Sequence, residues 1–156
     1  MLKLNRLTDY AVVILSRLSK EPGAVQTAGE ISGGTGLPLP TVSKILKLMA
    51  RSSLIASHRG VNGGYSLDRL AGEVRVAEIV EVLDGPIALT ACVDGATEHC
   101  DIEASCPMRG NWNTVNQAIR TALDSVTLAD LLDPSETFPV IQGVTEVSKG
   151  LDNYPS

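Results

Sequence analysis

Three cysteines are the residues of this sequence with the clearest capacity for chemistry. Cys92, Cys100 and Cys106 are all of its thiols, and they fall within fifteen residues of a segment rich in acidic side chains and poor in apolar ones. Cysteine that serves as a small core residue is instead found at buried, apolar positions. The clustering therefore indicates that the thiols share a ligand or a redox function.

The spacing of the cysteines separates the possible ligands. Seven residues lie between Cys92 and Cys100, and five between Cys100 and Cys106. Structural zinc usually takes cysteine pairs about two to four residues apart, so zinc fits this spacing less well, although His99 would complete a Cys3His set. Sensing by the thiols alone is a further alternative, with His99 and Arg109 as the nearby groups that could activate them. An iron–sulfur cluster suits wider spacing, and three cysteines leave one ligand position to another group.

The sequence carries no sign of secretion or membrane insertion. An odd number of cysteines argues against a disulfide framework. The sequence has no run of about eighteen apolar residues. Charged residues interrupt the segment 1–20, and no small-residue cleavage site follows it. We therefore expect a cytoplasmic protein without a membrane partner.

The formal net charge of −5 is unevenly distributed. Residues 1–60 carry eight Lys or Arg and three Asp or Glu, a balance of +5. Residues 61–156 carry five basic and fifteen acidic residues, a balance of −10. This asymmetry predicts a basic surface for a polyanion near the N-terminal end. Ordinary solvated helix faces are the alternative.

Three helices are predicted within the basic residues 1–60. Apolar residues at three- and four-residue spacing predict an amphipathic helix over 7–18. Thr27 and Glu30 have the spacing of a capping box, which opens a short second helix. A third helix follows the sequence LPLP and ends near Ser53. Its exposed face is expected to carry Thr41, Ser43, Lys44, Lys47 and Arg51.

A hairpin is predicted to follow the third helix. The strand-like runs 54–60 and 65–70 are joined by the glycine-rich sequence GVNGG. Three helices and a hairpin make a winged helix-turn-helix domain, so the fold class is mainly α with a small β-hairpin wing. Arg59 lies where the first strand enters the wing tip, and we expect it to contact DNA; a solvated hairpin charge is the alternative.

The second half of the chain is expected to support the cysteine segment. Helical spacing predicts a helix over 76–84, which Gly85 and Pro86 end. Helical spacing resumes over 110–126, where the apolar stripe consists of Trp112, Val115, Ile119, Leu123 and Val126. A long stripe without an evident partner in the chain predicts a two-fold dimer contact, and packing onto the winged domain is the alternative.

These elements divide the chain into four expected regions. They are a winged DNA-binding domain (1–84), a cysteine-bearing loop (85–109), a dimerisation helix region (110–132) and a disordered tail (133–156).

Several motifs together resemble a known family. The sequences LTDYAVVIL, GLPLPTVSKILKLM and LIASHRGVNGGYSL, with three cysteines before a long helix, resemble the Rrf-type winged-helix iron–sulfur regulators (IscR-, NsrR- and RirA-like). The pattern RGxxGGYxL over 59–67, combined with Cys-x7-Cys-x5-Cys, carries most of the resemblance. It covers residues 1–132, and the regulators of SUF-type iron–sulfur assembly are the nearest group.

The resemblance implies a set of cluster ligands. Cys92, Cys100 and Cys106 would hold a cluster, more often 2Fe–2S than 4Fe–4S. IscR-like members supply a histidine three residues after the last cysteine, but Arg109 occupies that position here. In other members an acidic residue of the first helix, provided by the partner subunit, is the fourth ligand, and Asp9 matches it. A simple charge in the first helical turn is the alternative for Asp9, and His99 is another candidate ligand.

The resemblance also implies how DNA is bound. The third helix would lie in the major groove and the wing in the minor groove. The expected DNA-binding residues are Thr41, Ser43, Lys44, Lys47, Arg59, Asn62, Gly63 and Gly64.

The function that this resemblance implies is a homodimeric repressor of iron–sulfur assembly genes, whose cluster modulates operator binding. It is not expected to be an enzyme or to take a small-molecule substrate. Sensing of nitric oxide or iron through the cluster, or a zinc or thiol-only site, are the alternatives.

Overall fold

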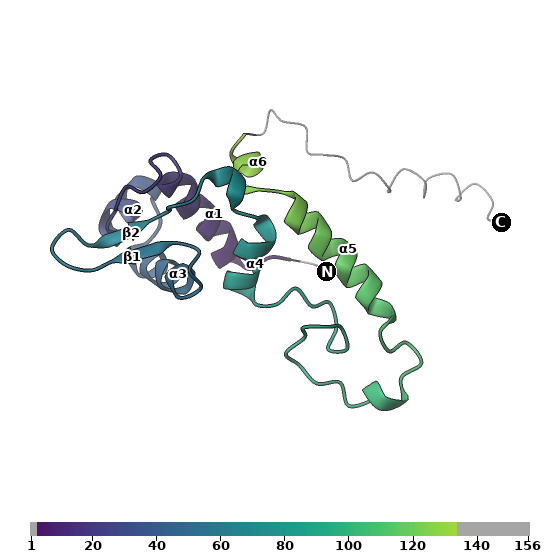
Figure 1. Cartoon of the computed structure of the whole chain (residues 1–156). Helices are drawn as coiled ribbons and strands as arrows, with labels where there is room; N and C mark the ends of the chain where they lie inside the picture. Colours follow the sequence, from purple (N-terminus) through teal and green to yellow (C-terminus); the bar gives the residue numbers. More distant parts are fainter. Residues whose placement is uncertain (1–2, 134–156) are drawn as a thin grey trace, which may run out of the picture.

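The computed structural model describes residues 3–133, which form six α-helices, one two-stranded hairpin and two 3₁₀ turns (Figure 1). The elements are α1 (Arg6–Leu18), α2 (Ala28–Thr35), α3 (Leu39–Arg51), β1 (Ala56–His58), β2 (Gly64–Ser66), η1 (Ala71–Glu73), α4 (Val76–Asp84), η2 (Glu103–Ser105), α5 (Asn111–Ser125) and α6 (Leu128–Leu132). The expected tail over 133–156 lies, apart from Asp133, outside the described residues.

The order helix, helix, helix, hairpin confirms the winged helix-turn-helix prediction. One apolar cluster joins α1, α2, α3 and α4 with the base of the hairpin. Ile14, Ile31, Ile45 and Ile79 are fully buried within it, one from each of these helices. Aliphatic side chains spaced three and four residues apart line one face of each long helix, and their burial drives the helices together. The opposite face of α3 is left free.

The N-terminus of α2 has the capping box that its sequence predicts. Thr27 Oγ1 accepts from the Glu30 N–H, while the Thr27 N–H and hydroxyl donate to the Glu30 carboxylate at 2.7 and 2.9 Å. These hydrogen bonds favour the ionised carboxylate and hold the pKa of Glu30 below its ordinary value. The start of the helix-turn-helix is therefore set by local sequence.

The hairpin is shorter than predicted and has an additional partner. Its strands pair antiparallel with Ser57 opposite Tyr65, and the second strand ends at Ser66. Gln26 pairs with the outer edge of β2, exchanging two backbone hydrogen bonds with Tyr65 at 2.8 and 2.9 Å. The segment between α1 and α2 thereby ties the wing to the helical core.

The predicted helix over 110–126 ends earlier than expected, and no single helix runs on to residue 132. Helix α5 ends at Ser125, and Val126 is extended because its carbonyl accepts from the Val76 N–H at 2.9 Å. Thr127 then caps the short helix α6, in which Leu128 is fully buried in the winged-domain core. The end of the apolar stripe therefore packs back onto the winged domain, while the start of α5 does not.

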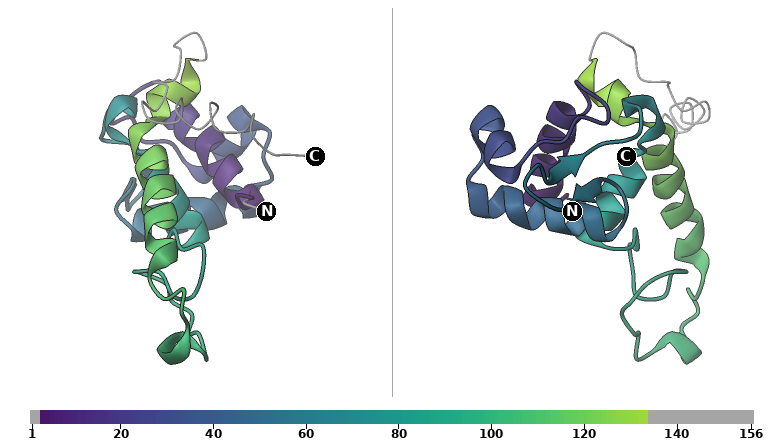
Figure 2. Two further views of the ribbon diagram at one scale, coloured as in Figure 1. Left: turned by 90° about the vertical axis from the view of Figure 1, so that its right-hand side faces the viewer. Right: turned by 60° about the vertical axis from the view of Figure 1, so that its left-hand side comes forward.

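The cysteine loop and the wing project from the body in different directions, and α5 runs beside α4 towards the loop (Figures 1 and 2). Among residues 3–133, no helix is long and apolar enough to cross a bilayer.

Candidate DNA-binding face and cysteine loop

The solvent face of α3 carries the predicted recognition residues. Lys44 and Lys47 are exposed one helical turn apart, whereas Thr41 and Ser43 are half-buried. Val42, Ile45, Leu46 and Met49 occupy the opposite, fully buried face. The helix is therefore held by its apolar side and presents two ammonium groups on its free side.

The wing presents a second polar surface. Arg59 and Asn62 are exposed at its tip, and Val61 between them is fully exposed. At the base of the wing, His58 Nε2 lies 2.8 Å from Ser66 Oγ, which donates to Asp68 at 2.6 Å. This chain of hydrogen bonds crosses the two strands and stiffens the support from which Arg59 projects.

The two glycines predicted to contact DNA have a structural role in the wing. A Cβ atom on Gly63 would lie 2.6 Å from the His58 carbonyl oxygen, and one on Gly64 would lie 2.5 Å from the carbonyl oxygen of Gln26. Both distances are too short for a side chain, so these positions let the backbone of the wing approach its neighbours. Close packing of the wing accounts for both glycines without any contribution from DNA.

Two arginines of the winged domain form contacts within the fold. The Arg17 Nε donates to Gln26 Oε1 at 2.8 Å, and its guanidinium lies against Gly34 of α2. Arg69, after the wing, forms a 2.7 Å ion pair with Glu78, which raises the pKa of Arg69. These two guanidinium groups join elements of the fold, whereas Lys44 and Lys47 of α3 and Arg59 of the wing are exposed.

The three cysteines lie on the loop between α4 and α5, and all are free and half-buried. Cys92 Sγ is 3.2 Å from Thr90 Oγ1. Within residues 3–133, no three His, Cys, Asp or Glu side chains lie close enough to hold a metal ion. In the described part of the chain, the three cysteines thus lie on one loop without gathering around a common centre.

Cys100 lies beside the two other groups that the sequence singled out near the thiols. It lines an open pocket of about 390 Å³ with the exposed side chains of His99 and Arg109 and with Glu103. Arg109 Nε and Glu103 Oε1 form a 3.5 Å ion pair. Arg109, which stands where IscR-like members have a histidine ligand, therefore pairs with a carboxylate of the same loop.

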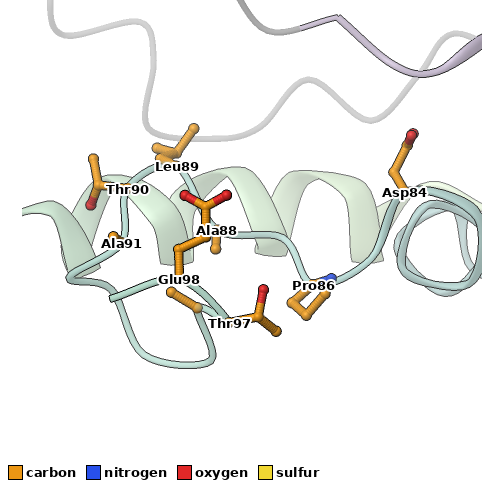
Figure 3. A pocket seen from close by; sticks show the side chains of 9 residues that line it. Asp84, Pro86, Ala88, Leu89, Thr90, Ala91, Thr97 and Glu98 are labelled. Carbon is orange, nitrogen blue, oxygen red and sulfur yellow. The ribbon is translucent and has the colours of Figure 1, made fainter. Parts of the chain in front are cut away.

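The first part of the loop folds back on itself. A pocket of about 230 Å³ at the start of the loop is lined by side chains from the ranges 84–91 and 96–98, including Ala88 and Glu98 (Figure 3). Its lining contains no cysteine. We assign it no role in ligand binding.

Asp9, the predicted fourth ligand, is exposed in the first turn of α1. A neighbouring carboxylate instead joins α1 to the start of the loop. Asp84 Oδ2 accepts from the Asn5 N–H at 3.1 Å and from Thr8 Oγ1 at 2.7 Å. The start of α1 is therefore fixed to the end of α4, and the exposed Asp9 carboxylate takes no part in this contact.

Two asparagines of α5 that the sequence did not single out contact the cysteine loop. Asn113 and Asn116 bind its backbone through their side-chain amides. Their three-residue spacing beside an apolar stripe is the signal that sequence inspection could have used, since a buried amide needs hydrogen-bond partners.

A protein-family comparison gives this architecture an identity. A model of the Rrf2 family, described as iron-dependent transcriptional regulators, matches residues 4–134. The chain belongs to the Rrf2 family. The resemblance inferred from the motifs is thus confirmed, and this Rrf2 protein is a DNA-binding transcriptional regulator.

Solved structures of Rrf2-type regulators share the fold. CymR (YrzC), the global cysteine regulator of B. subtilis, is 26% identical over 84% of this chain and 96% of its own, with a TM-score of 0.63. IscR of T. potens is 27% identical over 93% of this chain and 96% of its own, with a TM-score of 0.58. The oxidized form of Staphylococcus aureus CymR is 24% identical over 87% and 100% of the two chains, with a TM-score of 0.59, and supports the fold alone.

Proposed function

We propose that this Rrf2 protein is a homodimeric, iron–sulfur cluster-dependent repressor, with SUF-type iron–sulfur assembly genes as its targets. The observation that carries the proposal is the placement of all three thiols, half-buried, on one loop attached to a winged domain with a free basic face. The similarity to T. potens IscR and the family description as iron-dependent regulators support it.

The donor set suits the proposed cofactor. Three thiolates are the ligands that iron–sulfur clusters use, and a carboxylate or imidazole completes the set in Asp9 or His99. Bound through Cys92, Cys100 and Cys106, a cluster of 2Fe–2S type would supply a charge and redox state that change with cellular conditions. Because thiolates repel one another without a cation, the three thiolates are expected to come together only when the cluster is bound.

The chain's own residues then perform the regulation. Lys44 and Lys47 neutralise phosphates or reach base edges in the major groove, and Arg59 enters the minor groove, where a narrow A·T-rich stretch concentrates negative potential. The half-buried Thr41 and Ser43 and the exposed Asn62 lie on the same two surfaces.

We assign residues 1–84 to DNA binding, 85–109 to the cluster and 110–132 to dimerisation. Trp112 and Val115, each 43% exposed on α5, supply the apolar surface of the dimer contact. Two winged domains then read half-sites about one helical turn apart.

Anaerobic purification tests the proposal directly. The expected protein is coloured, contains iron and acid-labile sulfide in equal amounts, elutes as a dimer, and changes its affinity for promoter DNA when the cluster is removed. Replacement of Cys100 by Ala abolishes normal cluster loading. A protein without acid-labile sulfide that binds DNA equally with and without metal would contradict the proposal.

A thiol-based function is the second candidate, because CymR of B. subtilis, a cysteine regulator, has the same fold at comparable identity. In that case the anaerobic protein contains neither iron nor sulfide, and mild oxidation of the cysteines alters DNA binding. Zinc analysis of the same preparation tests a Cys3His site. Exposing the loaded protein to nitric oxide or an iron chelator identifies the signal if the cluster is present.

A further inference from the structure

Two asparagines of α5 hold the first part of the cysteine loop. Asn116, only 7% exposed, donates from Nδ2 to the Ile87 carbonyl oxygen at 2.9 Å and accepts at Oδ1 from the Leu89 N–H at 3.0 Å. Asn113, one turn earlier, accepts at Oδ1 from the Asp94 N–H at 2.9 Å and donates from Nδ2 to Asp94 Oδ2 at 3.1 Å. Each amide thus uses both its donor and its acceptor on the loop.

These contacts lie on both sides of Cys92. The next residue, Val93, is 5% exposed and is the one buried hydrophobic side chain between residues 85 and 110. On the preceding side, Thr90 Oγ1 lies 3.2 Å from Cys92 Sγ. The segment 87–94 is therefore attached to α5 by four hydrogen bonds, and Cys92 lies inside it beside the buried Val93.

The remainder of the loop lacks comparable attachment. Within the described part of the chain, the hydrogen bonds and the ion pair of residues 97–110 all join partners inside 97–113. Typical examples are the turns closed by the Cys100 carbonyl with Glu103 N–H and by the Cys106 carbonyl with Arg109 N–H. Cys100 and Cys106 thus belong to an arm that is ordered by its own turns and not by the body of the protein.

We propose that Asn113 and Asn116 are positioning residues that hold Cys92 on α5 before cofactor binds, while Cys100 and Cys106 lie on an arm that closes onto it. The inference rests on the proposed cluster-binding function and adds which ligand is preorganised and by which side chains. Because the residues around Cys92 are already ordered, fewer residues lose conformational freedom when the cluster binds. This preorganisation favours cluster binding. The two asparagines also connect the segment around Cys92 to α5, the helix that carries the exposed Trp112.

Hydrogen exchange of the apo protein tests the anchoring without any cofactor. In the wild type, the amides of Leu89 and Asp94 are expected to exchange more slowly than those of residues 97–110. Asn116→Ala speeds exchange at Leu89 and Asn113→Ala speeds it at Asp94, each by about tenfold, as expected for the loss of one hydrogen bond. Gln117→Ala, an exposed position on the same helix, is the matched control and leaves both rates unchanged.

Cluster release to an iron chelator tests the positioning role. Each asparagine variant is expected to lose its cluster at least about tenfold faster than the wild type and the Gln117→Ala control, because removal of groups that orient a ligand costs about that much in affinity. Asn113 is only half-buried, so Asn113→Ala tests the inference should Asn116→Ala fail to fold. The thermal unfolding of the apo variant checks that its fold is intact.

Different outcomes separate this inference from the proposed function. Wild-type exchange at Leu89 and Asp94 in both asparagine variants, or wild-type cluster lifetimes, would overturn the positioning role. A wild-type protein that takes up no iron and sulfide would overturn the proposed function and the cluster role of the asparagines with it. The exchange rates would then still decide whether the two amides hold the segment 87–94.

Discussion

Replacing Lys47 by Ala is expected to weaken DNA binding in a salt-dependent manner. The Lys47 side chain is exposed on α3, on the face opposite the buried residues that hold the helix to the core. Alanine has the highest helix propensity, so the variant retains α3 and the fold. The change therefore removes one positive charge per protomer from the proposed recognition face and leaves the core intact.

The magnitude of the effect follows from the number of phosphate contacts that the substitution removes, since each contact releases counterions from the DNA. Each neutralised phosphate contributes about 0.9 to the slope of log affinity against log salt on duplex DNA. In a homodimer the substitution removes two such contacts, so the slope becomes shallower by about 1.8. Between about 50 and 200 mM salt, the wild type's advantage over Lys47→Ala is then expected to shrink about tenfold.

Fluorescence anisotropy across a salt series measures this slope. The probe is a labelled duplex selected by the wild-type protein from a random-sequence pool. Lys20→Ala is the matched control, because Lys20 is an exposed lysine outside α3 that shares a pocket with Arg17 and Glu30. It is expected to leave the slope unchanged. Parallel salt plots for the wild type and Lys47→Ala would refute the placement of this lysine at a phosphate.

Three further substitutions test other parts of the molecule. Leu128→Ala removes a fully buried side chain that fixes α6 to the winged domain, and is expected to lower the free energy of unfolding by about 2–5 kcal/mol in urea titrations; a loss below about 1 kcal/mol would contradict that packing. Asp9→Ala should shorten the lifetime of the cluster in oxygen without altering the unfolding of the apo protein; an unchanged lifetime would assign the fourth ligand elsewhere. Glu30→Gln tests the capping box. The pKa of Glu30 in the folded state lies below its ordinary value of 4.5, so the ionised carboxylate stabilises the fold above pH 4.5. This stabilisation is lost as the pH falls through the lowered pKa. The wild type should therefore exceed Glu30→Gln in stability near neutral pH, and the difference should shrink on acidification; a constant difference would argue against the carboxylate's role.

Much of the winged domain could be predicted because its signals are local. The capping box of Thr27 and Glu30 spans three residues, and the apolar spacing of α1, α3 and α4 repeats within single helices. The glycine-rich sequence GVNGG likewise predicts the turn of the hairpin. For the candidate site, residue type and spacing predict the three thiols as ligands and Lys44 and Lys47 as DNA contacts, and the structure shows that both lysines are exposed.

Other features depended on contacts between distant parts of the chain. The stripe of α5 continues in sequence through Val126, yet the helix ends because Val126 and Leu128 pair with backbone near residues 74–76. Gln26 gives no sequence signal for its pairing with Tyr65 of the wing. Helical periodicity describes a helix in isolation, and it cannot register a competing partner that folding brings alongside.

The sequence by itself determined the chemistry available to this protein: three thiols in one segment, a basic N-terminal half and the elements of a winged helix. Only the tertiary structure decided how the thiols are held, with Cys92 attached to α5 through Asn113 and Asn116 and the other two on a separate arm. The physical reason is that residue type and spacing act over a few positions. The hydrogen bond between Leu89 and Asn116 joins positions 27 residues apart, which only the folded chain brings together.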